Sequence, residues 1–221
     1  FRNIEPVTIT QAGFPVVTVV TINVDDGNLT PNEPLTTQIT DGGNAADNVL
    51  FLDAPGGSED MTFPMPSNSL TINGDADDDD TITVTSVDTG YGATLIINGH
   101  GGDDTVNLNG DITFASGNDL DVDLTDDASA GDVDSIAVGA GANLVLSGGG
   151  TATLKASRNV ALASGSSVEV VDGNLTVEAN QQATPTSGNF VGVDVDGGLL
   201  QSTGTGIVTV KGRGGSDAGG Y

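Results

Sequence analysis

Aspartate is the residue type with the clearest capacity for chemistry in this chain, and it gathers in two glycine-rich turns. One turn follows Leu70-Thr-Ile-Asn73 and the other follows Leu95-Ile-Ile-Asn98. If the turns lie on adjacent layers, their carboxylates are roughly 5 Å apart, and Ca²⁺ would relieve the repulsion between them because it binds six to eight flexible oxygen ligands. The sequence therefore favours a solvated acidic edge, with a structural calcium site as the alternative. The candidate ligands are Asp75, Asp77, Asp78, Asp79, Asp80, Asp103 and Asp104.

A second acidic segment, Asp119-Leu-Asp-Val-Asp-Leu124, places three carboxylates on one face of an expected strand. Paired carboxylates serve glycoside hydrolysis as acid and as base or nucleophile. Sugar sites usually also contain aromatic platforms, and this chain has two Tyr and no Trp. A carbohydrate-active β-helix enzyme that uses an Asp pair is therefore kept as the alternative to a non-catalytic role. Further carboxylates close in sequence are Asp111, Asp126, Asp127, Asp132 and Asp134.

Other catalytic constellations have less support. His100 is the only histidine, and its place in a glycine-rich turn is typical of an ordinary turn residue. The sequence has no Gly-x-Ser-x-Gly nucleophile elbow. It has no Cys, so it offers neither a thiolate nor a disulfide. We therefore predict that the chain is not an enzyme, with calcium as its only expected cofactor.

The charge is strongly negative and unevenly distributed. The formal net charge is −26, and no Lys or Arg occurs between Asn3 and Leu154, where 25 of the 31 acidic residues lie. Nucleic acids and anionic membranes are bound by basic patches, so both are excluded as partners. No apolar run approaches the roughly 20 residues that span a bilayer, so no membrane insertion is expected. The few bases are expected to pair with acids of the next coil or the next molecule.

The two acidic turns belong to a repeat. Asn73-Gly74 recurs as Asn98-Gly99. Asp79-Asp80-Thr81-Ile82 recurs as Asp103-Asp104-Thr105-Val106, at an offset that is one residue shorter. A period of this length is typical of stacked repeats, and about 24 residues suit one coil of short strands and tight turns. The sequence therefore predicts an all-β fold, a right-handed parallel β-solenoid (β-helix) of roughly 24-residue coils.

The repeat can be followed along the chain. Asp134-Ser-Ile-Ala-Val138 and Asn159-Val-Ala-Leu-Ala163 continue it, and Asp47-Asn-Val-Leu-Phe-Leu52 is interpreted as a degenerate earlier copy. Residues 1–66 are expected to form either a less regular β region or the first coils, and residues 67–221 are expected to form the regular solenoid. The start at Phe1 and the glycine-rich end suggest a piece of a longer chain. Strands are expected at 7–10, 16–24, 70–73, 81–86, 93–97, 105–108, 111–114, 120–124, 134–138, 143–147, 151–156, 159–163, 167–171, 174–179, 190–195 and 206–211.

Alternation within these strands identifies the residues of the core. The inward face is expected to carry Leu144, Leu146, Val168, Val170, Leu175, Val177, Val191, Val193, Val195, Val208 and Val210. No helix of any length is expected, because no i, i+3, i+4 pattern is sustained. Both ends of such a stack are open edges, and with no capping helix they would be covered by neighbouring repeats or by other molecules.

Two resemblances follow from these residues. Gly99-His-Gly-Gly-Asp-Asp-Thr-Val-Asn107 resembles the RTX-type nonapeptide, which Gly99, Gly102, Asp104 and Val106 match. The segments 159–168, 172–182 and 206–215 are similar to repeats of giant secreted bacterial surface proteins of the filamentous-haemagglutinin or adhesin-like kind. This resemblance implies a structural or adhesive segment at the bacterial cell surface or outside the cell. The partners it implies are copies of itself or flanking repeats, joined end to end, and cell-surface or extracellular glycans.

Overall fold

The computed structural model describes residues 8–10, 17–24, 36–43, 46–53, 60–76, 78–125 and 132–215. These residues form an all-β fold, and no helix occurs among them. The described part accordingly contains no helix long and apolar enough to cross a membrane. This agrees with a sequence in which Gly, Asp, Thr and Val predominate at the expense of helix formers.

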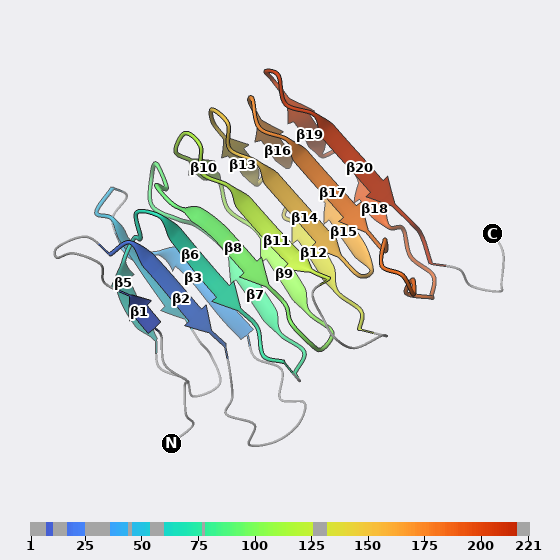
Figure 1. Ribbon diagram of the computed structural model, residues 1–221, viewed down its shortest axis with the longest axis horizontal. Coiled ribbons are helices and arrows are strands. Elements are labelled where there is room, and N and C mark those ends of the chain that lie inside the picture. The colour runs from blue at the N-terminus through green and yellow to red at the C-terminus, as the bar shows by residue number, and fades with distance from the viewer. Residues whose placement is uncertain are drawn as a thin grey trace.

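The strands form three sheets that run side by side along the molecule (Figure 1). Sheet A consists of β1 Thr8–Thr10, β2 Val19–Asn23, β6 Ser69–Asn73, β8 Thr94–Asn98, β11 Leu120–Leu124, β14 Ala152–Ala156, β17 Leu175–Ala179 and β20 Val208–Gly212. Sheet B consists of β5 Met61–Pro64, β4 Val49–Asp53, β3 Thr36–Asp41, β7 Thr81–Val84, β9 Thr105–Leu108, β12 Ser135–Val138, β15 Asn159–Leu162 and β18 Val193–Val195. Sheet C consists of β10 Ile112–Phe114, β13 Asn143–Leu146, β16 Ser167–Val170 and β19 Leu199–Ser202.

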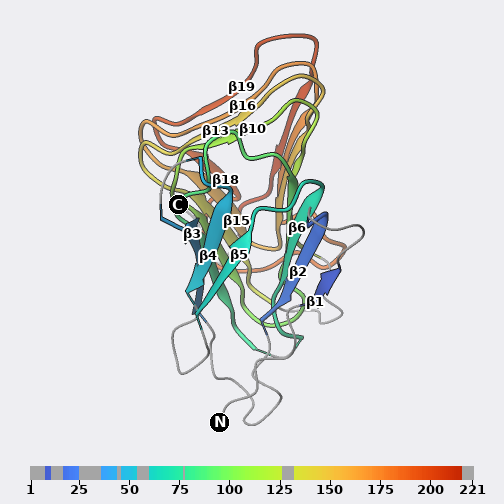
Figure 2. The ribbon, with the colours of Figure 1, turned by 90° about the vertical axis from the view of Figure 1, so that its left-hand side faces the viewer.

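The chain visits the sheets in turn, so that each coil lies on the one before. From β8 onward the order is A, B, C, and within each sheet the successive strands are parallel and in register. In Figure 2 the N-terminal end faces the viewer and the chain recedes clockwise, which makes the coil right-handed. The predicted parallel β-solenoid is therefore confirmed. The three sheets form the sides of a triangular prism. Sheet C begins only at β10, so the first coils have two sheets and the prism is not closed there.

Coil length varies more than the repeat alone indicates. Thr81 pairs with Thr105 and Leu70 with Leu95, which confirms the steps of 24 and 25 residues read from the sequence. Longer steps of 30 to 33 residues occur where Asp104 bonds to Asp134 and Lys211 to Glu178. These coils contain the long connections 125–134 and 180–192, which leave the strand register unchanged.

The core is a set of apolar columns between the sheets. In β11, Leu120, Val122 and Leu124 are buried, whereas the intervening Asp121 and Asp123 are partly exposed. The same alternation recurs in β6, β8, β14 and β17, so each inward side chain packs on its equivalent in the next coil. Tyr91 and Phe114 meet edge to face, with ring centroids 5.6 Å apart, where sheet C begins. Burial raises the pKa of the Tyr91 hydroxyl well above its usual value.

The N-terminal end is covered by antiparallel strands. β4 pairs antiparallel with β3 and β5 antiparallel with β4, while β1 pairs antiparallel with β2. The interpretation of Asp47–Leu52 as an earlier repeat is therefore wrong, because the parallel partner of β7 is β3. Asp88, a buried residue that the sequence did not single out, accepts hydrogen bonds from the backbone N–H groups of Ala46 and Asn48 and so fixes the β3–β4 turn.

The C-terminal end has no such cover within the described residues. β20, β19 and β18 are the last strands of sheets A, C and B, so each has one unpaired edge. Four valines predicted to be buried are exposed here: Val191 at 55%, Val195 at 42%, Val208 at 37% and Val210 at 47%. Their pairing with buried residues of the preceding coil shows that Val195, Val208 and Val210 do face inward. They are exposed because no described coil lies on top of them.

Candidate functional site

The acidic turns stack where the chain enters sheet B. Asp80, Asp104 and Asp134 immediately precede β7, β9 and β12, and all three side chains are buried. The N–H of Asp80 donates to Oδ1 of Asp104 at 2.9 Å, and the N–H of Asp104 donates to Oδ1 of Asp134 at 2.9 Å. The N–H of Asp134 donates to the hydroxyl of Ser157 at 2.8 Å. We call Asp80, Asp104 and Asp134 the inner aspartate ladder.

A second row of contacts lies outside this ladder. The N–H of Asp103 donates to Oδ1 of Asp79, and the N–H of Val133 donates to Oδ1 of Asp103, both at 2.8 Å. Asp79 and Asp103 are exposed. Asp79 and Asp103, two of the predicted ligands, therefore lie one coil apart, as expected. The carboxylate of each, however, accepts a backbone N–H group of the next coil.

The remaining predicted calcium ligands belong to the upstream turn. The N–H of Asp75 donates to Oδ2 of Asp80 at 2.6 Å, and Asp78 is buried. Asp77 lies outside the described residues. Among the residues that the structure describes, no group of three or more His, Cys, Asp or Glu side chains is arranged to hold a metal ion. Calcium binding by these carboxylates therefore stays a prediction.

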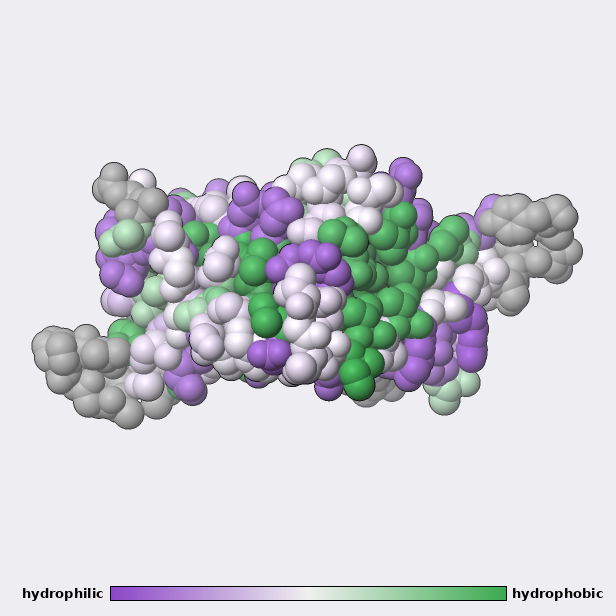
Figure 3. Space-filling view, turned by 90° about the horizontal axis from the view of Figure 1, so that it is seen from above, coloured by the Kyte–Doolittle hydropathy of each residue, from purple (hydrophilic) through white to green (hydrophobic). Residues whose placement is uncertain are grey.

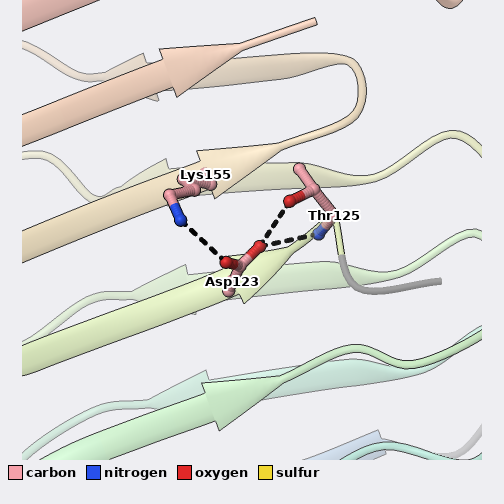
Figure 4. Close-up of polar contacts among 3 residues, drawn as sticks. All are labelled: Asp123, Thr125 and Lys155. Atoms are coloured by element: carbon pink, nitrogen blue, oxygen red, sulfur yellow. Dashed lines mark hydrogen bonds and ion pairs between the residues drawn. The ribbon is translucent and has the colours of Figure 1, made fainter. Parts of the chain in front are cut away.

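The candidate sugar-cleaving acids lie on the outer face of sheet A, on and beside β11. Oδ1 of Asp119 accepts hydrogen bonds from the N–H and the hydroxyl of Thr151, at 2.7 and 2.9 Å. Oδ2 of Asp123 is 3.0 Å from Nζ of Lys155, and its Oδ1 accepts the N–H of Thr125 at 3.0 Å (Figure 4). Two of the three acids are therefore engaged with the chain itself.

Asp121 and Asp123 have different proton affinities although they share one strand face. Burial raises the pKa of Asp121, and the charges of Asp123 and Asp119 raise it further against the opposing effect of Lys155. Burial also pushes the pKa of Asp123 upward, but hydrogen bonds from Thr125 and Lys155 outweigh burial and hold that pKa below its usual value. Neighbouring acids with diverging pKa values are the pattern found in acid–base catalysis.

The outlying acids do not gather around this pair. Oδ1 of Asp111 accepts the N–H of Asn143 at 2.8 Å on sheet C, a different face of the prism. Asp132 and Asp134 stand at the entrance to sheet B. Asp126 and Asp127 lie outside the described residues. The acids grouped by sequence proximity are thus distributed over three sheets.

The sequence reasoning missed one arrangement, a column of polar side chains that crosses successive strands on the outer face of sheet A. Nδ2 of Asn98 donates to Oδ1 of Asn73, and Nδ2 of Asn73 donates to Oδ1 of Asn23, both at 2.8 Å. The strand register continues this column through Asp123, Lys155, Glu178 and Lys211. The signal in the sequence was the coil offset, which brings these residues into one row.

In the charged half of this column, two of the bases pair with acids of the adjacent coil, as expected for them. Nζ of Lys155 is 3.0 Å from Oδ2 of Asp123, and Nζ of Lys211 is 2.7 Å from Oε1 of Glu178.

His100 has φ 68°, the left-handed conformation of a turn, as expected from its position among glycines.

No protein-family model, curated protein or solved structure matches this chain.

Removal of the Lys155 ammonium tests the charged column. The pKa of Lys155 is raised by its hydrogen bond to Asp123, so its contribution to stability is present at neutral pH and is lost as pH rises through that raised pKa. The pKa of Asp123 is lowered, so its contribution is lost as pH falls through it. We expect Lys155→Met to lower the free energy of unfolding by about 1 kcal/mol at pH 7. Urea titrations at pH 7 and at a pH below the lowered pKa of Asp123 should show this loss disappearing once that carboxyl is protonated. An equal loss at both pH values would contradict the ion pair.

Proposed function

We propose that this chain is a non-catalytic structural segment, a stiff β-solenoid that spaces or presents other parts of a bacterial surface protein or fibre. The observation that carries the proposal is the use made of its polar side chains. Asp104 bonds to Asp80, Asp119 to Thr151 and Lys155 to Asp123, each across one coil step. These charged side chains thus hold neighbouring coils together, which is what a rigid structural segment requires.

The dimensions favour the same role. Seven parallel strands of sheet A, from β2 to β20, follow one another without interruption. At the usual strand spacing, their six steps extend about 29 Å, and every step is held by backbone hydrogen bonds. A stack of this kind transmits force along its axis because each coil contacts its neighbours over two sheets in the first coils and over three sheets from β10 onward.

An extracellular or cell-surface location is part of the proposal. It is supported by the acidic composition and by the resemblance of the repeats to bacterial surface proteins. The segment could also bind extracellular glycans, which would make it adhesive as well as structural. A panel of immobilised polysaccharides, assayed for both binding and release of reducing ends, separates these roles. Binding without turnover indicates adhesion, and turnover would contradict the non-catalytic assignment.

Calcium is the one cofactor that the proposal includes, and it has its own test. Thermal unfolding followed by circular dichroism, with EDTA and with millimolar Ca²⁺, should show a calcium-specific rise in Tm if the acidic turns bind the ion. A ligand present at 100 times its dissociation constant adds about 2.7 kcal/mol of stability. The control is Mg²⁺ at the same concentration, and Asp79→Asn with Asp103→Asn should remove the rise. An identical Tm in all three solutions would contradict calcium binding.

A carbohydrate-active enzyme remains the second candidate because one observation favours it. Asp121, with a raised pKa, and Asp123, with a lowered pKa, lie two residues apart on one face. If this pair were catalytic, Asp121→Asn should abolish hydrolysis of a responsive polysaccharide, whereas Asp111→Asn on sheet C should leave it unchanged. On the structural proposal, we expect no hydrolysis above the buffer blank by the unmodified chain.

A further inference from the structure

The chain contains a dipeptide that can modify itself, asparagine followed by glycine, at three places: Asn73-Gly74, Asn98-Gly99 and Asn109-Gly110. In such a pair the backbone nitrogen of the glycine can attack Cγ of the asparagine side chain, because glycine has no Cβ that would shield the nitrogen. The attack forms an N–Cγ bond, breaks the bond between Cγ and Nδ2, and releases ammonia. The structure decides which of the three pairs has both reacting groups available.

The first two pairs are held at both reacting groups. Nδ2 of Asn98 donates to Oδ1 of Asn73, and Nδ2 of Asn73 donates to Oδ1 of Asn23, both at 2.8 Å. The attacking nitrogens are also engaged, because the N–H groups of Gly74 and Gly99 donate to backbone carbonyl oxygens of the next coil, at 2.9 and 3.4 Å. Both glycines are buried. Reaction at either pair would first have to break these contacts between coils.

The third pair is held at neither group. Asn109 is exposed, whereas Asn73 and Asn98 are partly buried. In the part of the chain that the structure describes, the side-chain amide of Asn109 and the N–H of Gly110 take part in no hydrogen bond. The amide nitrogen that would leave and the backbone nitrogen that would attack are therefore both available here.

This pair lies in the connection from β9 to β10, at the corner where the chain passes from sheet B to sheet C. Sheet C forms the upper side of the molecule in Figure 2, and Figure 3 views that side from above. Outside the C-terminal part, residues of hydrophilic or intermediate hydropathy cover much of the surface in Figure 3. Water, which the second step of the reaction consumes, therefore has access to this side.

We propose that Asn109 is a site of spontaneous deamidation, and that the stacked coils protect Asn73 and Asn98 from the same reaction. After the loss of ammonia, the cyclic imide takes up one water molecule and opens at either of its two carbonyl carbons. One opening gives aspartate. The other gives isoaspartate, in which the backbone runs through the side chain and is one carbon longer. The reaction consumes water alone, and the inference does not depend on the proposed structural role.

Both products change the corner between the sheets. Aspartate adds a negative charge two residues before Asp111, whose Oδ1 accepts the N–H of Asn143 at 2.8 Å. Isoaspartate lengthens the backbone next to Gly110, where space is short, because a Cβ added at Gly110 would overlap the carbonyl oxygen of Thr85 in the coil below. Deamidation at this position would therefore disturb the contact between coils at the start of sheet C.

Mass spectrometry of the incubated full chain tests the proposal. The chain is kept folded in mildly alkaline buffer and then digested with pepsin at acidic pH, since trypsin finds no Lys or Arg between Asn3 and Leu154. Asn109 should convert roughly thirtyfold faster than Asn73 or Asn98, each of which must first open one side-chain and one backbone hydrogen bond. Equal rates at the three sites would overturn the proposal. So would an intact Asn109 after the time in which the unfolded chain converts fully.

The unfolded chain separates the effect of the stack from that of the local sequence. In concentrated urea the contacts between coils are lost, so the three sites should convert at rates within about threefold of one another. If Asn109 remained fastest by the same factor in urea, its neighbours in the sequence would be the cause, and the proposed protection by the stack would be wrong.

Side-chain variants test the protection directly. Asn73→Ala removes the Oδ1 that holds Nδ2 of Asn98, so Asn98 should convert roughly fivefold faster while Asn109 keeps its rate. Asn73→Asp keeps an acceptor and should leave Asn98 slow. Asn109→Gln should abolish the fast conversion, because the longer side chain closes a larger ring far more slowly. Circular dichroism should show unchanged strand content in all three variants. No acceleration of Asn98 in Asn73→Ala would overturn the protective role of the column.

Discussion

Replacing Asp104 with alanine is expected to lower the free energy of unfolding by about 3 kcal/mol, the sum of a buried hydrogen-bond group left unsatisfied and a small cavity. Asp104 is buried, and its Oδ1 accepts the N–H of Asp80 from the preceding coil at 2.9 Å. The backbone N–H of Asp104 in turn donates to Asp134, so the residue links three coils. Urea titration monitored by circular dichroism at pH 7 measures the loss.

Two variants make this experiment specific to the inner aspartate ladder. Asp103→Ala removes the adjacent carboxylate, which is exposed and accepts the N–H of Val133, so water replaces it and the loss should stay below about 1 kcal/mol. Asp104→Asn keeps an oxygen acceptor and should lose less than Asp104→Ala. If Asp104→Ala were no more damaging than Asp103→Ala, the ladder would not stabilise the stack.

The Gly173→Ala variant is expected to lose about 3 kcal/mol by overpacking, which corresponds to a decrease in Tm of roughly 6–12 °C. Gly173 is buried in the turn before β17, and an added Cβ would overlap the carbonyl oxygen of Gly150 in the coil below. Neither group is a flexible side-chain end, so the coils themselves would have to separate. Differential scanning calorimetry measures the change in Tm.

The neighbouring Gly149 provides the matched control. A Cβ added at Gly149 meets no atom within 4 Å. The residue change and the turn region are the same, so an effect of glycine on the unfolded chain is common to both variants. Gly149→Ala should therefore keep Tm within about 2 °C of the original or raise it slightly. Equal decreases in both variants would contradict the close approach of the coils at Gly173.

The fold could be predicted because the repeat constrains it closely. Asn73 and Asn98 were matched in the sequence at an offset of 25 residues, and they are partners in the sheet. Once the offset is known, alternation decides which side chains point inward, and the buried Leu144, Val168 and Leu175 follow from it. The prediction that failed concerned a segment outside the regular repeat. The strand β4 resembles the repeat in composition but turns back on β3, which is a matter of tertiary pairing.

The candidate site was less predictable, for a physical reason. The sequence indicated that Asp80 and Asp104 stack, and they do, but it could not show that the carboxylate of Asp104 reaches the N–H of Asp80. Side-chain direction depends on the turn conformation, which the residue types leave open. Asp123 and Lys155 are aligned in the same way as Asn73 and Asn98, but the coil between them is 32 residues long. That step depends on the long connection 125–134, whose length effect the sequence did not reveal.

Hydrogen exchange at the backbone amides of Asp80, Asp104 and Asp134 tests the central claim most directly, that acidic turns bind successive coils together. On this account these amides, although they lie in turns, are bonded to buried Asp104, Asp134 and Ser157 side chains. We therefore predict exchange as slow as that of core strand amides such as Val106. Exchange at the rate of an unfolded chain would contradict the ladder and with it the proposed role of the aspartates.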